Sequence, residues 1–600
     1  MSQDFDNNKA NSKPDTESNT ASNTKGMSNR LTNYGDANFS LFLRKAFIKG
    51  MGYTDDALSR PVIGIANTYS GYNACHGNVP GLVESVKRGV MLAGGLPVDF
   101  PTITLHESFA HPTSMYLRNL MALDTEEMIR AQPMDAVVLI GGCDKTVPAQ
   151  LMAAASAGVP TVQVVTGPML SGSHRGVRVG ACTDCRRYWA AYRGEDIDDA
   201  EINEVNDKLV PTVGTCSVMG TASTMACLAE TLGIMLPNSA SAPAVYADRL
   251  RIAEQSGAEA VRVAREGVTP DQILTPDAFE NALRVLLALG GSTNALIHLT
   301  AMAGRLGIDI DLDAFDQMSR ETPVLVDLKP SGEGYMEDLH RAGGLPTLLR
   351  ELRPLLHLDA MTINGRTLGE NIEAAVHLVD QQVVRPLSSP VYAQGGIAVL
   401  RGNLAPKGAI IKQSAASTEL MTHRGRAVVF RSLEDLAERI DAPDLDVRAD
   451  DVLVLQNIGP KGAPGMPEAG YIPIPKKLAA QGVKDMVRIS DGRMSGTAAG
   501  TIVLHVSPES AEGGPLGLVR DGDTISLDVA ANRLELEVEQ ATLEARRREA
   551  ATPSSQGEPI LGYRRLFMEQ ILQAEEGCDF RVCRPSPRCR VPNIKITDNR

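Results

Sequence analysis

The 600-residue sequence has few aromatic side chains and no excess of positive charge. Phe, Trp and Tyr make up 4% of the residues, and the formal net charge is −14. Nucleic-acid-binding surfaces are usually basic and often carry stacking aromatic side chains. The composition therefore predicts no nucleic-acid partner. An acidic protein that binds an anionic substrate needs local positive charge, which a metal ion can supply.

Long apolar runs are also missing, and none approaches the roughly 20 residues of a membrane span. Residues 1–30 are polar, rich in Asn, Ser and Thr, and lack the apolar segment of a secretory signal. We expect these residues to form a disordered tail of a cytoplasmic protein with no membrane partner. In that compartment the nine cysteines are more often reduced, metal-bound or catalytic than bridged.

From Pro61 onward, apolar runs typical of strands alternate with runs of helical periodicity, which is typical of a parallel α/β sheet. The expected strands cover residues 61–68, 100–105, 135–142 and 160–165. Helical patterns dominate from about residue 217 to 356, and Thr275 with Pro276 makes a good start for one helix. We predict an α/β domain with a parallel sheet over residues 31–380.

Near Arg385 the pattern changes to short β-rich runs separated by Gly, Pro and Asp turns. These runs cover residues 395–402, 408–415, 426–430, 451–457, 485–490, 501–506, 524–529 and 533–538. Many short strands with few helices favour a barrel or a sandwich. We predict a β-rich, barrel-like C-terminal domain over residues 381–600.

Three cysteines occupy positions where strands end or helices begin. Cys75 and Cys143 each follow an expected strand, and Cys216 precedes a helical pattern. Strand ends of an open parallel sheet meet at one crevice. Three thiolates there could hold an iron–sulfur cluster and leave one iron position open to substrate. The alternative for any one of them is a buried structural cysteine, because free Cys is among the most buried residues.

Oxygen ligands accompany these cysteines. Asp144 follows Cys143 directly and could bind Mg²⁺, which prefers oxygen donors. Lys145 beside a metal could act as a base, pair with an anion, or be carbamylated into a further oxygen ligand. Glu107 follows an expected strand, and Glu468 lies in a loop rich in Gly and Pro. The alternative for Lys145 and both glutamates is solvent exposure, the usual fate of Lys and Glu.

Ser495 lies in a tight turn after a strand, with Gly496 next to it. This setting suits a hydroxyl surrounded by backbone N–H groups. No Asp and His follow in the order of a hydrolase triad. A serine near a metal cation could lose its proton and act as a base, although an ordinary turn serine is the alternative.

At these residues the sequence resembles the dihydroxy-acid dehydratase/6-phosphogluconate dehydratase family, which includes the sugar-acid dehydratases. The resemblance extends from about Leu31 to Val529. It rests on several motifs in the same order, at residues 61–68, 73–82, 141–153, 214–225, 289–299, 395–412, 465–468 and 490–500. So many matches in one order make a chance resemblance very improbable.

The resemblance implies a role for each candidate residue. Cys75, Cys143 and Cys216 would hold the cluster, with [2Fe–2S] favoured over [4Fe–4S]. Mg²⁺ would be bound by Glu107, Asp144, Glu468 and a carbamylated Lys145. Ser495 would abstract the proton, with Lys145 as a second catalytic candidate. The substrate would be bound by Thr221, Ser223 and Thr497. The family also implies a homodimer or homotetramer.

The resemblance further implies a reaction, the loss of water from a 2,3-dihydroxy acid to give a 2-keto-3-deoxy acid. Biosynthetic dihydroxy-acid dehydratases usually carry an Asp in a motif where this chain has Glu107. This departure favours a sugar acid, such as a pentonate, as substrate. The alternative is 2,3-dihydroxy-isovalerate of branched-chain amino-acid synthesis, which needs an apolar pocket instead of polar groups.

Other interpretations have less support in the sequence. Cys182 and Cys185 form a C-x-x-C motif, but no second such pair completes a zinc site, so we interpret the pair as incidental. A dinucleotide-binding protein would show G-x-G-x-x-G after the first strand, and this chain does not. A non-catalytic α/β scaffold with merely buried cysteines is the third alternative, and a brown colour of the purified protein would exclude it.

Overall fold

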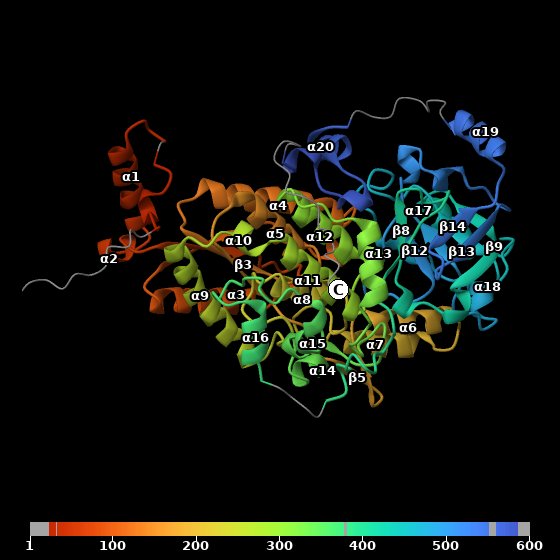
Figure 1. The fold of residues 1–600 in the computed structure, drawn as a ribbon, viewed down its shortest axis with the longest axis horizontal. Helices are drawn as coiled ribbons and strands as arrows, with labels where there is room; N and C mark the ends of the chain where they lie inside the picture. Colours follow the sequence, from red (N-terminus) through yellow and green to blue (C-terminus); the bar gives the residue numbers. More distant parts are fainter. Residues whose placement is uncertain (1–22, 32, 377–380, 551–559, 586–600) are drawn as a thin grey trace, which may run out of the picture.

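The computed structural model describes residues 23–31, 33–376, 381–550 and 560–585, which form two large sheets with their helices and a two-stranded antiparallel sheet of β5 (Gly172–His174) and β6 (Val177–Val179) (Figure 1). A four-stranded sheet lies in the N-terminal half, and an eight-stranded sheet in the C-terminal half. The predicted division after residue 380 falls on residues 377–380, which are outside the described residues.

The N-terminal sheet has the order β2-β1-β3-β4, and all its strands are parallel. Its strands are β1 (Val62–Asn67), β2 (Leu96–Pro101), β3 (Ala136–Gly141) and β4 (Thr161–Val165). The predicted parallel α/β sheet is confirmed, but the second strand begins four residues earlier than expected. The backbone N–H of Ile103 donates to the Asp124 carboxylate at 2.9 Å instead of to a strand, so the chain leaves the sheet there.

Helices cover this sheet on both faces. The longer helices of this half are α1 (Ala37–Lys49), α3 (Val79–Leu92), α4 (Ser114–Ala131), α5 (Thr146–Ala157), α6 (Thr183–Arg193), α7 (Asp199–Leu209), α8 (Thr221–Thr231), α9 (Ala247–Glu266), α11 (Pro276–Ala288), α12 (Asn294–Arg305) and α13 (Leu312–Glu321). Thr275 caps α11 as expected, since its side chain accepts from the N–H of Ala278. Shorter helices are α2 (Asp55–Leu58), α10 (Pro270–Ile273), α14 (Met336–Arg341), α15 (Leu345–Glu351) and α16 (Leu368–Ala374).

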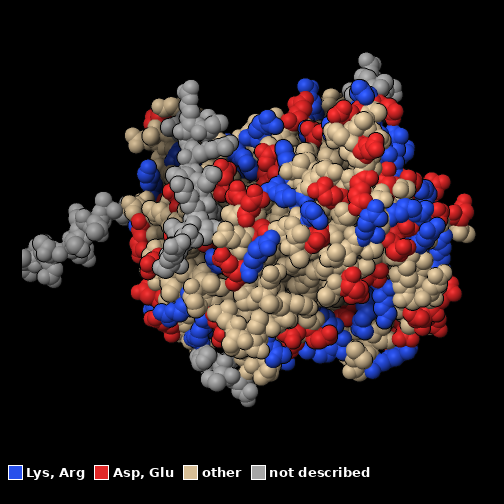
Figure 2. Space-filling view, turned by 45° about the vertical axis from the view of Figure 1, so that its right-hand side comes forward, with Lys and Arg blue, Asp and Glu red and all other residues tan. Residues whose placement is uncertain are grey.

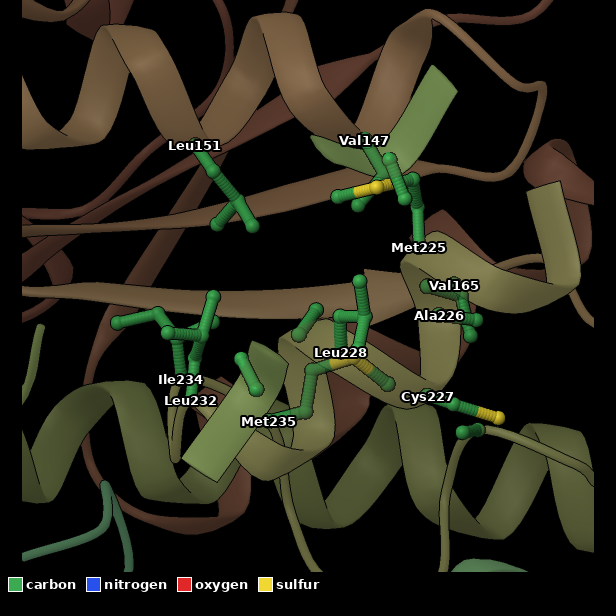
Figure 3. Close-up of a cluster of buried hydrophobic side chains, with 14 of the residues drawn as sticks. Val147, Leu151, Val165, Met225, Ala226, Cys227, Leu228, Leu232, Ile234 and Met235 are labelled. Carbon is green, nitrogen blue, oxygen red and sulfur yellow. The ribbon is translucent and has the colours of Figure 1, made fainter. Parts of the chain in front are cut away.

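The apolar core fixes α5 and α8, the two helices that follow Cys143 and Cys216. Val147 and Leu151 of α5 and Met225 and Leu228 of α8 point into one interior (Figure 3). Cys227 belongs to this cluster and is fully buried, so it is a core side chain. Burying such side chains stabilises the fold by about 1.5–3 kcal/mol each, which holds both helix starts in place.

The C-terminal sheet has the order β14-β13-β9-β10-β11-β12-β8-β7. Its strands are β7 (Ala398–Leu400), β8 (Gly408–Ile411), β9 (Thr422–Phe430), β10 (Val452–Leu455), β11 (Arg488–Ser490), β12 (Ile502–Ser507), β13 (Thr524–Asp528) and β14 (Arg533–Leu536). Arg401 joins the two ends, because its N–H donates to Asn532 O at 2.8 Å and its carbonyl accepts from Leu534 N at 2.7 Å. The predicted barrel-like domain is confirmed, and each expected β-run contains a strand.

Few helices accompany the barrel, namely α17 (Leu433–Arg439), α18 (Lys476–Ala479) and α19 (Gln540–Ala550). Helix α20 (Gly562–Gln570) and the segment after it lie on the N-terminal half (Figure 1), where Tyr563 donates its hydroxyl to the Tyr116 carbonyl of α4 at 2.7 Å. There Arg305 of α12 and Asp579, both fully buried, form an ion pair of 2.8 Å. Arg118 of α4 also donates to the carbonyl of Cys578 at 2.7 Å. The segment that contains Cys578 and Asp579 therefore stabilises the contact between the two halves.

The predicted tail, residues 1–30, is wrong for its last part, whereas residues 1–22 lie outside the described residues. Gly26 donates its backbone N–H to the buried Asp135 carboxylate at 3.0 Å. Met27 is buried in a cluster with Leu58, Val62 and Phe100. Residues 26 and 27 are ordered because Gly26 supplies a hydrogen-bond donor to the buried Asp135 carboxylate and Met27 packs in an apolar cluster.

Charges of both signs alternate over the face seen in Figure 2, without a continuous basic patch. In the described part of the chain, no helix is both long and apolar enough to cross a membrane.

Candidate active site

The three predicted cluster cysteines come together at the carboxyl edge of the N-terminal sheet. Cys75 lies in a short 3-10 turn, Ala74–His76, after β1, and Cys143 lies between β3 and α5. Their sulfurs and a ring nitrogen of His106 lie within 4.8 Å of one another. Contact with the Cys143 thiol and burial raise the pKa of Cys75, and the charge of Cys216 adds to this. Such crowded thiols need a metal ion before all can ionise.

His76 holds the Cys143 turn in shape. Its Nε2 accepts the backbone N–H of Gly142 and of Cys143, both at 3.0 Å, and its Nδ1 lies 2.9 Å from the Thr68 carbonyl. Burial lowers the pKa of His76 to about 4. The ring is therefore neutral at pH 7, with its proton on Nδ1, as two incoming N–H donors require.

Three carboxylates meet next to the cysteines. Oxygen atoms of Glu107, Asp144 and Glu468 lie within 4.8 Å of one another. Asp144 adjoins the cluster site directly, since one of its oxygens is 3.6 Å from the Cys143 sulfur. Glu468 belongs to the C-terminal half, in the turn Glu468–Tyr471, so the site lies between the two halves.

Two fully buried cations face these carboxylates. Lys145 contacts Asp144 and lies 3.3 Å from Glu107. Arg493 contacts Glu468 and lies 3.0 Å from Glu107. Burial alone would raise the pKa of Glu107, but Arg493 and Lys145 hold it well below its usual range. Burial and the Arg493 charge would lower the pKa of Lys145, yet the carboxylates together raise it.

The donor atoms fit two kinds of metal group. Clustered thiolates suit an iron–sulfur cluster, and three converging carboxylates suit Mg²⁺. Three carboxylates against two cations leave one negative charge at the oxygen site. Carbamylation of Lys145 would remove one cation and add oxygen donors, which strengthens the fit to a divalent cation.

Ser495 follows β11 and lies against the start of α8. Its hydroxyl is 2.8 Å from the Thr497 hydroxyl. A Cβ on Gly496 would come within 2.8 Å of the Thr221 nitrogen and 2.6 Å of Ser292, so only glycine allows this approach. The turn therefore faces the N-terminus of a helix of 11 residues, where backbone N–H groups favour an anion.

The structure separates the three predicted substrate residues. Thr221 and Thr497 both adjoin the Ser495 turn, and the Thr221 hydroxyl is 2.7 Å from that of Ser292. Ser223 instead donates its hydroxyl to the Cys216 carbonyl at 3.3 Å, which supports the cysteine loop.

Sequence reasoning missed four buried or half-buried groups, which are Arg493, Lys412, His76 and His106. Lys412 directly follows β8 and is fully buried, and its ammonium donates to the Gly496 carbonyl at 3.3 Å. Burial lowers the pKa of Lys412 to about 7, and no carboxylate in the described ranges forms an ion pair with it. For Arg493 and Lys412 the available signal was a basic residue inside an otherwise apolar or Gly-rich motif.

The C-x-x-C pair, Cys182 and Cys185, was interpreted as incidental, but it lies next to the predicted cluster cysteines. The Cys182 sulfur is 3.6 Å from that of Cys216. Cys185 is one helical turn further along α6 and contacts Cys182.

Comparison with known proteins finds relatives along most of the chain. The model of the dihydroxy-acid/6-phosphogluconate dehydratase N-terminal domain matches residues 60–371, and that of the C-terminal domain matches residues 382–578. An L-arabonate dehydratase of Azospirillum brasilense is 48% identical over 554 residues, covering 91% of this chain and 95% of the relative.

Two further relatives differ in the substrate that their names give. A 6-deoxy-6-sulfo-D-gluconate dehydratase of Pseudomonas putida is 44% identical over 529 residues, covering 88% of this chain and 91% of the relative. A dihydroxy-acid dehydratase of Acetivibrio thermocellus is 40% identical over 541 residues, covering 89% of this chain and 96% of the relative. With both domain models matched along most of its length, the chain belongs to the dihydroxy-acid/6-phosphogluconate dehydratase family.

Proposed function

We propose that the protein is a hydro-lyase that removes water from a sugar acid and yields a 2-keto-3-deoxy acid. The observation that carries this proposal is one continuous site. It combines clustered thiols, three carboxylates and a serine turn at a helix N-terminus. The sugar-acid dehydratases among its relatives, at 44–48% identity, support a sugar acid over 2,3-dihydroxy-isovalerate.

We propose that Cys75, Cys143 and Cys216 hold an iron–sulfur cluster, with [2Fe–2S] favoured. Glu107, Asp144, Glu468 and a carbamylated Lys145 would hold Mg²⁺. When bound, these groups supply Lewis-acid chemistry, which withdraws charge from the hydroxyl and carboxylate oxygens of the substrate.

The protein's own groups bind the substrate and move its proton. The N-terminus of α8, with the Thr221 hydroxyl, would bind the substrate carboxylate. Ser495 Oγ would take the C2 proton, and Thr497, 2.8 Å away, would orient that oxygen. A free serine hydroxyl is too weak an acid for this role, so nearby positive charge must stabilise its alkoxide. Lys412, on the carbonyl of the next residue, supplies such charge when protonated.

A substrate panel tests the proposal. Anaerobically purified enzyme with Mg²⁺ is incubated with L-arabinonate, other aldonates and 2,3-dihydroxy-isovalerate, and keto-acid release is measured. We expect at least one aldonate to react with a higher kcat/KM than 2,3-dihydroxy-isovalerate. A higher kcat/KM for 2,3-dihydroxy-isovalerate than for every aldonate would instead indicate a function in branched-chain amino-acid synthesis. If no substrate in the panel gives a keto acid, the proposed dehydratase activity is refuted.

We also propose that the chain forms a cytoplasmic homodimer or homotetramer, in which α1 takes part. Phe42, Phe47 and Met51 on α1 and the turn after it are 66%, 78% and 76% exposed. Large apolar side chains grouped in this way mark contact surfaces. In sedimentation, the pair of changes Phe42→Glu and Phe47→Glu should shift the protein toward monomer, whereas Leu561→Glu, at an exposed site elsewhere, should not. An unchanged mass of the paired variant would exclude α1 from the interface.

A further inference from the structure

A fourth cysteine lies at the predicted cluster site. Cys182 immediately precedes α6, and its sulfur is 3.6 Å from the sulfur of Cys216, a residue 34 positions away in the chain. This is too long for a disulfide, whose sulfurs are about 2.05 Å apart. A tetrahedral metal ion with sulfur ligands at about 2.3 Å places two of those sulfurs about 3.8 Å apart. The spacing of Cys182 and Cys216 is therefore close to that of two ligands of one metal ion.

The cysteines of the site fall into two pairs. Cys75 and Cys143 adjoin each other within 4.8 Å, and Cys182 adjoins Cys216. The backbone N–H of Gly214, in the loop before Cys216, donates to the carbonyl of Ala74, next to Cys75, at 3.1 Å, so the two pairs are neighbours. Two pairs of thiolates, one on each iron, are the ligands of an ordinary four-cysteine [2Fe–2S] cluster.

The backbone around Cys182 is held firmly in this place. Asp184, fully buried, accepts the N–H of Gly180 at 2.8 Å and the hydroxyl of Tyr335 at 2.8 Å. Thr183 donates its hydroxyl to the Thr497 carbonyl at 3.0 Å, which ties the segment to the Ser495 turn. Contacts that do not involve its own sulfur therefore hold Cys182 beside Cys216 and connect its segment to the Ser495 turn.

We infer that Cys182 is a fourth sulfur ligand of the centre, sharing one iron atom with Cys216. This inference rests on the proposed cluster and goes beyond its three expected ligands. Because the proposed reaction needs an open iron position, Cys182 would hold that position at rest and would have to give it up to a substrate hydroxyl. The thiolate would keep its electron pair and the hydroxyl oxygen would donate one in its place, so the exchange would involve neither oxidation nor reduction. Cys182 and Cys216 are both half-buried, whereas Cys75 and Cys143 are buried, so the proposed iron of Cys182 and Cys216 is the more accessible one.

Spectroscopy of the intact enzyme tests the inference. Wild type, Cys182→Ser and the matched control Cys185→Ser are purified anaerobically. Iron and acid-labile sulfide per chain, visible absorption, and the EPR spectrum after dithionite reduction are then measured. We expect Cys185→Ser to match wild type and Cys182→Ser to keep its iron with shifted absorption bands and g values. Adding L-arabinonate should shift the wild-type spectrum and leave that of Cys182→Ser nearly unchanged.

The outcomes separate this inference from the proposed function. Wild type without iron would refute the proposed cluster itself. Wild type with a full cluster and a Cys182→Ser spectrum identical to it would refute only the role of Cys182. If Cys182→Ser does not fold, iodoacetamide labelling of wild type decides the question. Cys182 should then be protected in the holoenzyme and exposed to alkylation after iron is removed, and equal labelling of both forms would overturn the inference.

Discussion

Replacing Arg493 by Met tests the charge balance of the carboxylate site. Arg493 is fully buried and binds Glu468, Glu107 and, at 2.8 Å, the Thr113 hydroxyl. Methionine is similar in length and apolar. It would leave three carboxylates with Lys145 as their one remaining cation within this group. The variant should therefore be less stable in Mg²⁺-free buffer.

The size of the effect follows from burial. Removing one partner of a buried ion pair costs about 3–5 kcal/mol, because the other charge stays buried without compensation. A ligand that binds only the folded state restores about 2.7 kcal/mol when its concentration is 100 times its Kd. Because Arg493→Met makes the site more negative, Mg²⁺ should stabilise this variant more than it stabilises wild type.

Thermal unfolding followed by circular dichroism, with and without Mg²⁺, measures both effects. Arg305→Met is the matched control, since Arg305 is equally buried but pairs with Asp579 away from the site. Both variants should unfold at lower temperature than wild type, and Mg²⁺ should raise the unfolding temperature of Arg493→Met by more than it raises that of Arg305→Met or of wild type. If Mg²⁺ shifts both variants equally, or neither, the carboxylates form only an ion-pair network and the metal assignment fails.

Three further changes test neighbouring groups. Ser495→Ala should keep the colour and the Mg²⁺ but lose kcat by roughly 10²–10⁴-fold; C2-proton exchange at the wild-type rate would make Ser495 a turn residue and Lys145 the next candidate base. Lys412→Met should remove a pH dependence of stability. Burial lowers the pKa of Lys412 from 10.5 to about 7 in the folded protein. Between about pH 7 and 10.5 the unfolded chain therefore binds one more proton than the folded protein, and the free energy of unfolding of wild type rises with pH. The urea midpoints of the two proteins should therefore converge toward high pH, and a constant difference would contradict this. His76→Phe should lower iron bound per chain, since the N–H groups of Gly142 and Cys143 lose their acceptor, and unchanged iron content would show that the turn holds without it.

The sequence predicted the strands well because each is a short apolar run between turn residues. The three cysteines and Asp144 could be placed together from the general geometry of parallel sheets, whose strand ends share one edge. The second strand was misplaced because an acceptor outside the sheet, Asp124, takes the N–H of Ile103. No periodicity in residues 100–105 carries that information.

The missed residues have a common cause, which is dependence on distant partners. Arg493 is 386 positions from Glu107 in the chain, and its carboxylate partners alone explain why it is buried. Cys182 contacts Cys216 because the start of α6 packs against the loop of Cys216, and the sequence around neither cysteine indicates this packing. Tertiary contacts of this kind follow from packing of whole elements, whereas motif spacing reports only what is close in sequence.

The long separation between Glu107 and Arg493 also sets an order of events during synthesis. Cys75, Cys143, Cys182 and Cys216 all emerge from the ribosome before the barrel strands do, and domains generally fold as units from the N-terminus. The four thiols of the proposed iron–sulfur site are thus synthesised before the barrel. The proposed Mg²⁺ site is complete only after Glu468 and Arg493 are synthesised and the two halves come together.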